Sequence, residues 1–160
     1  MLQRLCSAFV LSALLFTAAP VLADTVSHAE ANIQFFVPDT WSQEQDGATL
    51  TISAPDNSMS LIFWVVDVEE LEDVGAAIDE ALDEIMTQVD HGEVEETKIN
   101  GFQAFYVDGT GLLEGHSAEW QAAVLLADKP LVMLALGLEG TFEHFDDDLQ
   151  RLLKSIRRAR

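Results

Sequence analysis

The chain has 160 residues, about half of them apolar, and its 28 acidic and 8 basic residues give a net charge of −20. This length and composition suit one domain with its own hydrophobic core. Such an acidic surface repels nucleic acid and anionic lipid, which excludes binding to either as a main function. It would attract a basic protein or divalent cations.

Residues 1–23 have the pattern of a secretory signal peptide. Arg4 supplies a positive start, an apolar run follows, and Pro20 ends that run. Small residues stand at −3 and −1 of a cleavage site after Ala23. We therefore expect cleavage, a periplasmic or secreted mature protein, and no stable membrane anchor. An uncleaved anchor is the alternative, because the apolar run approaches the roughly 20 residues that a bilayer requires.

The chain has one cysteine, Cys6, which lies within the predicted signal peptide. It precedes the apolar run, so it cannot be the lipidated residue of a bacterial lipobox. The mature protein would then contain no cysteine. Disulfides, cysteine nucleophiles and thiolate metal sites are excluded.

A polar lead-in at residues 24–31 precedes the predicted strands. Seven segments rich in apolar residues and bounded by turn signals are predicted as strands, at residues 32–37, 48–54, 59–66, 92–99, 102–113, 116–127 and 131–138. Two of them are apolar on both faces, residues 61–66 and 131–138, which indicates central strands. Asn100-Gly101 predicts a two-residue hairpin. Gly109 and Gly111 predict a bulge or bend in their strand.

Residues 67–90 are predicted as an amphipathic helix. Its apolar positions recur every three or four residues, at Leu71, Val74, Ile78, Leu82, Ile85 and Val89. The opposite face carries carboxylates and no Lys or Arg, which makes it a candidate partner-binding face, with Glu72, Asp79 and Asp83 as its test residues. Gly75, inside the helix, suggests close approach to a sheet.

A second amphipathic helix is predicted at residues 141–158, with three aspartates in its first turn and bases at its end. Two helices and two strands that need cover on both faces indicate an α+β fold. We expect an α/β/α sandwich with an antiparallel-rich sheet of six to seven strands. One helix would follow the third strand and another would close the chain, within a single domain at residues 32–160.

In this order of elements the chain resembles the PsbP/Mog-like superfamily, which includes exported bacterial members such as DcrB-type periplasmic proteins. The resemblance rests on Phe36-Val37-Pro38-Asp39-Thr40-Trp41, on the Leu50–Ile52 strand with the Pro55-Asp56 turn, and on the closing pattern Phe145, Leu149, Leu152-Leu153 and Ser155-Ile156. It implies an α/β/α sandwich. It assigns no function residue by residue, because the members bind different partners and no shared active-site motif stands in this sequence.

The sequence contains no spacing typical of a catalytic or metal site. His28, His91, His116 and His144 are isolated from one another. His116 and Ser117 are strand neighbours that point to opposite faces. Asp108 and Glu114 suggest at most a loose cation site, because the calcium-loop pattern fails.

Two further groups of residues have simpler interpretations. The aspartates Asp146–Asp148 are explained by the helix dipole and by pairing with Arg151. Trp41, Trp64 and Trp120 would fill the core, and a small ligand, if there is one, would lie in a sheet–helix cleft near them.

These observations predict an exported, non-enzymatic binding or accessory protein without a cofactor, whose acidic helix contacts a basic protein. Two alternatives stay open. One is a hydrolase-type enzyme whose site is assembled from distant residues, which a polar cleft with His116 beside a carboxylate would favour. The other is weak binding of divalent cations by the acidic surface.

Overall fold

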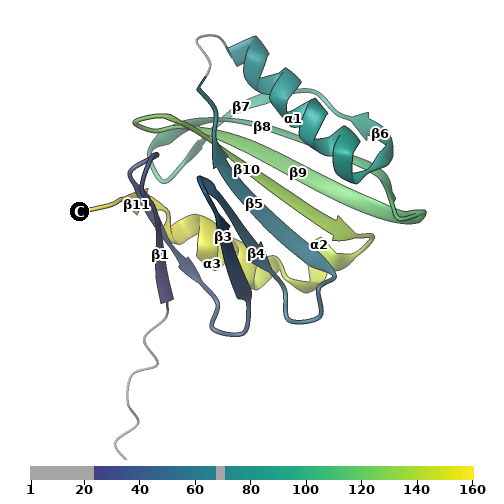
Figure 1. Ribbon diagram of the computed structural model, residues 1–160, viewed down its shortest axis with the longest axis horizontal. Helices are drawn as coiled ribbons and strands as arrows, with labels where there is room; N and C mark the ends of the chain where they lie inside the picture. The colour runs from purple at the N-terminus through teal and green to yellow at the C-terminus, as the bar shows by residue number, and fades with distance from the viewer. Residues whose placement is uncertain (1–23, 68–70) are drawn as a thin grey trace, which may run out of the picture.

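The computed structural model describes residues 24–67 and 71–160 (Figure 1). The predicted signal peptide lies outside these residues. The strands are β1 (Asp24–His28), β2 (Ile33–Val37), β3 (Ser42–Asp46), β4 (Thr49–Ser53), β5 (Met59–Val65), β6 (Thr87–His91), β7 (Glu95–Ile99), β8 (Phe102–Leu113), β9 (His116–Leu126), β10 (Pro130–Leu138) and β11 (Arg157–Arg158). The helices are α1 (Leu71–Ile85), α2 (Thr141–His144) and α3 (Asp146–Ser155).

Two antiparallel sheets organise this part of the chain. The larger has eight strands in the order β3-β4-β5-β10-β9-β8-β6, with β7 also paired to β8. The smaller has three strands in the order β1-β2-β11. The described residues therefore form a mostly antiparallel β-sheet protein with a few helices.

The central position predicted for residues 131–138 is confirmed. Strand β10 lies between β5 and β9, and Leu131 and Val132 are fully buried although they point to opposite faces. Strand β5 is buried mainly at alternate residues, and its other face carries Ile62 and Trp64, which pack against the core under α1. Both faces of the sheet are therefore covered.

Each face has its own hydrophobic core. Under α1, the side chains of Val74, Ile78 and Leu82 pack with Trp120 and Val132.

On the opposite face the cover is mixed, because β2 of the small sheet lies beside α3 (Figure 1). There Phe35 stacks on Phe63 with ring centroids 4.7 Å apart, and Trp41 meets Phe145 edge-on at 5.2 Å. Helices do lie on both faces of the large sheet, but on one face the covering layer also contains the strands of the small sheet.

The first predicted helix is too long at its C-terminal end. Helix α1 ends at Ile85, and Thr87–His91 forms strand β6 on the edge of β8. Pairing with β8 satisfies backbone groups that a longer helix would leave exposed on that edge, and β-branched Thr87 and Val89 suit a strand. Ile85, expected on the buried stripe, is 39 % exposed.

The predicted irregularity near Gly109 and Gly111 is found in the partner strand. The register shifts between Thr87 and Asp90 of β6, and Gln88 between them has a positive φ of 53°. The glycines allow close approach, since a Cβ on Gly109 would lie 2.7 Å from the Trp120 ring and would also overlap the Asp90 carbonyl oxygen.

Four strands were not predicted from the sequence, so the expected number of six to seven strands was too low. Residues 24–31, expected to be a lead-in, contain β1, which pairs with β2 along its whole length. Strand β3 is entirely polar and exposed, which leaves no apolar alternation to recognise. Strand β6 lies in the part predicted as helix. The closing helix ends at Ser155, and β11 pairs with β2 instead of continuing it.

The Asn100-Gly101 hairpin is confirmed, with both residues at positive φ (47° and 87°), as a type I′ turn requires. The Asn100 amide also donates hydrogen bonds to the carbonyl oxygens of Leu153 at 2.7 Å and Ile156 at 3.0 Å. The hairpin tip thus caps the C-terminal end of α3.

Replacing Gly109 by Ala should lower the free energy of unfolding by about 3 kcal/mol, because the added methyl group meets backbone and a buried ring. Urea denaturation measures this. Gly111→Ala is the matched control: its nearest contact is Cε of Met86 at 2.8 Å, a movable side-chain end, so a loss of about 1 kcal/mol is expected. Equal losses would contradict the assigned close approach.

Replacing Asn100 by Gly keeps the positive φ but removes both bonds to the end of α3. We expect a loss of about 1–2 kcal/mol in urea denaturation. Asn100→Ala should cost more, since Ala also resists the left-handed conformation. Stability unchanged in Asn100→Gly would show that the amide bonds contribute nothing.

Candidate functional site

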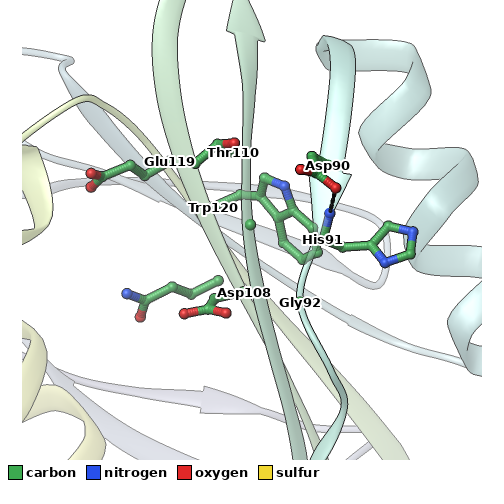
Figure 2. Close-up of a pocket in the computed structure, with 9 residues that line it drawn as sticks. Asp90, His91, Gly92, Asp108, Thr110, Glu119 and Trp120 are labelled. Atoms are coloured by element: carbon green, nitrogen blue, oxygen red, sulfur yellow. Dashed lines mark hydrogen bonds between the residues drawn. The ribbon is translucent and has the colours of Figure 1, made fainter.

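A polar groove of about 500 Å³ lies over β6, β8 and β9 (Figure 2). Asp108 is paired across the sheet with Gln121, and Thr110 with Glu119, so these four side chains share one face. The groove is lined by Asp90, His91, Gly92, Asp108, Gly109, Thr110, Glu119, Trp120 and Gln121.

Among the residues that line this groove, no carboxylate is hydrogen-bonded to a histidine side chain. Figure 2 shows His91 and the Trp120 ring on one side of the strands, with Asp108 and Glu119 on the other. The Asp90 carboxylate accepts a hydrogen bond from the His91 backbone N–H at 3.0 Å. Among the described residues no three His, Cys, Asp or Glu side chains are grouped to hold a metal ion. The groove can attract cationic groups, but it offers no preorganised proton transfer.

Tyr106 adjoins this groove and donates a hydrogen bond from its hydroxyl to Asp108 at 3.4 Å. Burial, and next the neighbouring Asp108 carboxylate, raises the pKa of Tyr106 to about 12. The hydroxyl therefore stays protonated well into the alkaline range, where an ordinary tyrosine ionises, and acts as a hydrogen-bond donor.

Helix α1 places the predicted carboxylate face in solvent. Because Val74, Ile78 and Leu82 are buried against the sheet, the positions between them point outward. Asp79, Glu80, Asp83 and Glu84 are exposed there.

No Lys or Arg occurs in α1. The ion pairs found among the described residues join Lys129 to Glu30, Arg151 to Asp148 and Arg158 to Asp128, so none neutralises this face. Of the three predicted test residues, the structure shows Asp79 and Asp83 on one face. The side chain of Glu72 lies outside the described part.

The other candidate residues are dispersed. His28 is buried in β1, where its Nε2 donates to the Ala48 carbonyl oxygen at 2.8 Å and its Nδ1 has no partner. His116 is exposed at the start of β9, and its side chain has no hydrogen bond or ion pair within the described part of the chain.

Asp108 and Glu114 do not form a cation site. They are six residues apart along β8 and its following turn, about 20 Å of extended chain. Among the three early aspartates of α3, Asp148 accepts from Trp41 Nε1 at 3.3 Å and pairs with Arg151 at 4.0 Å. Asp146 accepts from Gln150 at 2.8 Å.

The three tryptophans fill the cores. Trp41 belongs to the core under α3, while Trp64 and Trp120 belong to the core under α1. Trp41 therefore lies on the opposite face of the sheet from Trp64 and Trp120, and the three do not line a common cleft.

A second groove, of about 420 Å³, lies between α1 and the sheet. It is a sheet–helix cleft of the kind expected for a small ligand, but none of the three tryptophans lines it. Phe105 and Val107 of β8 form its floor, Val74 and Ile78 of α1 one wall, and Val94 its outer rim. Val94 is 66 % exposed. We name this the α1–β8 groove.

Gly75 of α1 also lines the α1–β8 groove. A Cβ built there would meet no atom within 4 Å, so the expected close approach to the sheet is wrong. A helix-interior glycine costs about 1 kcal/mol relative to alanine, and packing does not explain this one. Two features of the sequence could have indicated this groove. One is Gly75, a glycine inside a helix, and the other is Val94, a valine between Glu93 and Glu95.

Comparison with known proteins shows the fold alone. No protein-family model and no curated protein matches the sequence. Among solved structures, the chain is similar to the cyanobacterial PsbP protein CyanoP of Synechocystis, with a TM-score of 0.60 and 15 % identity over 90 % of this chain and 98 % of that one.

Two further structures are similar at the same level. One is a protein of unknown function from Pseudomonas aeruginosa, with a TM-score of 0.53 and 15 % identity over 82 % of this chain and 94 % of that one. The other is LpqN, involved in cell envelope biogenesis of Mycobacterium tuberculosis, with a TM-score of 0.50 and 14 % identity over 88 % and 86 %. The chain thus has a PsbP-like fold. No helix in residues 24–67 and 71–160 is long and apolar enough to cross a membrane.

Tyr106 is the single tyrosine of the chain, so its ionisation can be followed by absorbance near 295 nm. We expect a midpoint at about pH 12 in the folded protein. A raised folded pKa means that the unfolded state ionises first, so the contribution of Tyr106 to stability is complete below pH 10 and is lost between pH 10 and 12.

Asp108→Asn should lower this midpoint but leave it above 10, because burial is the larger cause. A midpoint at 10 in the folded wild-type protein would refute the described environment of Tyr106.

Proposed function

We propose that the protein is an exported, non-enzymatic binding or accessory protein whose outer α1 face contacts a basic protein. The observation that carries this proposal is the exposed row of carboxylates on α1, without a base in the helix. Charge of one sign over a whole helix face steers and orients a partner of opposite charge.

A periplasmic or secreted location is part of the proposal. It is supported by the signal-peptide pattern of residues 1–23 and by the fold shared with LpqN, a protein of cell envelope biogenesis. We also propose the finer relationship: a single-domain α/β/α member of the PsbP/Mog-like superfamily, from its DcrB-type periplasmic branch.

The two alternatives have less support. The hydrolase hypothesis needs His116 beside a carboxylate, and His116 lies at a turn without such a contact in the described residues. A specific cation site would need convergent ligands, and the described carboxylates are spread along strands and helix faces, which leaves only weak attraction of cations by the acidic surface. A protein that works by surface contact needs neither.

The test reverses three charges together: Glu72→Lys, Asp79→Lys and Asp83→Lys. Binding partners are captured from the exported fraction after mild crosslinking, and recovery should fall roughly tenfold because the attraction becomes repulsion. Recovery by the wild-type protein should also fall with added salt.

The control carries the same change of net charge elsewhere, through Glu44→Lys, Asp46→Lys and Glu114→Lys, which are exposed on β3 and the β8–β9 turn. It should keep the partner. If the α1 variant keeps it equally well, this face is not the contact surface.

A further inference from the structure

The α1–β8 groove has the composition of a binding groove for apolar side chains. Its lining is mainly hydrophobic, and its volume of about 420 Å³ is within the range of small-ligand and peptide pockets. Phe105 and Val107 are only partly buried on its floor. An incompletely covered apolar floor between two structural elements can accept a partner's side chain without displacing a core residue.

Both sides of the groove are built in a way that packing does not require. On the helix, a Cβ added at Gly75 would meet no atom within 4 Å, so this position is open. On the loop between β6 and β7, Val94 extends into solvent, although Gly92 fixes the start of that loop by donating its N–H to the Asp108 carbonyl oxygen at 2.8 Å. The groove is thus open on the helix side, at Gly75, and its loop side, at Val94, is apolar.

Carboxylates flank this apolar channel. Exposed Glu93 and Glu95 stand on either side of Val94, and exposed Asp79 follows Ile78 on the helix wall. A fatty acid would bring its anionic head to these carboxylates. A second copy of the chain would bring another net charge of −20. Both meet repulsion, whereas an apolar side chain flanked by Lys or Arg meets attraction.

We propose that the α1–β8 groove binds an apolar side chain of a basic segment of the partner protein, with Glu93, Glu95 and Asp79 contacting the flanking cations. This inference rests on the proposed function and deepens it. The helix face then supplies attraction, and the groove selects segments in which basic and large apolar residues are combined.

The experiment measures by calorimetry the affinity of the protein, purified from the exported fraction, for two synthetic peptides. One alternates Lys and Leu, and the other has Ser in place of every Leu. We expect the Lys/Leu peptide to bind about tenfold more tightly, since burying a leucine side chain adds the hydrophobic part of the binding.

Gly75→Leu should abolish this preference by filling the groove, while leaving the Lys/Ser affinity unchanged. It places a better helix former at a position without neighbours within 4 Å, so the variant should fold, which circular dichroism checks. Ala76→Leu is the matched control, one exposed position further on and outside the groove lining, and it should keep the preference. Val94→Ser should reduce the preference from the other side.

The outcomes separate the two proposals. Equal binding of both peptides, with no effect of Gly75→Leu, overturns the groove and leaves the basic-partner function standing. Binding of neither peptide overturns both. Decanoate that binds the wild type and not Gly75→Leu, or a dimer that this substitution dissociates in ultracentrifugation, also overturns the groove as a basic-segment site.

Discussion

The rest of the structure depends on strand β10, whose side chains are buried on both faces of the large sheet. Leu131 and Met133 point toward β2 and α3, whereas Val132 and Leu134 point toward α1. A strand of this kind is stable only when both faces are shielded from water, because backbone pairing alone does not bury its side chains. The amphipathic helices and the small sheet provide that shielding, and they turn the acidic residues outward.

The elements that could be predicted are those whose own residues determine them. Continuous apolar residues place β10 at the centre, and Asn100-Gly101 requires the positive φ angles of its hairpin. Strands β3 and β6 could not be predicted in this way. The residues of β3 are all exposed and become a strand only through pairing with β4. Those of β6 follow the helical pattern until β8 offers an edge.

The same distinction applies to the candidate site. Exposure of Asp79 and Asp83 follows from helical periodicity, because their buried neighbours on α1 point the other way. A cleft between helix and sheet was expected, but the lining of the α1–β8 groove could not be inferred, since it requires Val94 and Phe105 to meet α1. Gly75 was recognised in the sequence as an unusual residue within a helix, but its interpretation was wrong. It suggested tight packing on the sheet, whereas the structure places it in open space.

The small sheet has a consequence for the order in which the fold is completed. Strand β2 is paired on one side with β1 and on the other with β11, where Gln34 faces Arg157 and Ile33 faces Arg158. The third strand of this sheet is therefore supplied by residues more than a hundred positions further along the chain. A polypeptide that emerges N-terminus first, from a ribosome or through a membrane, cannot close this layer until Arg157 and Arg158 have emerged. Such long-range pairing slows folding, because the loop between the two strands must be closed before their contacts form.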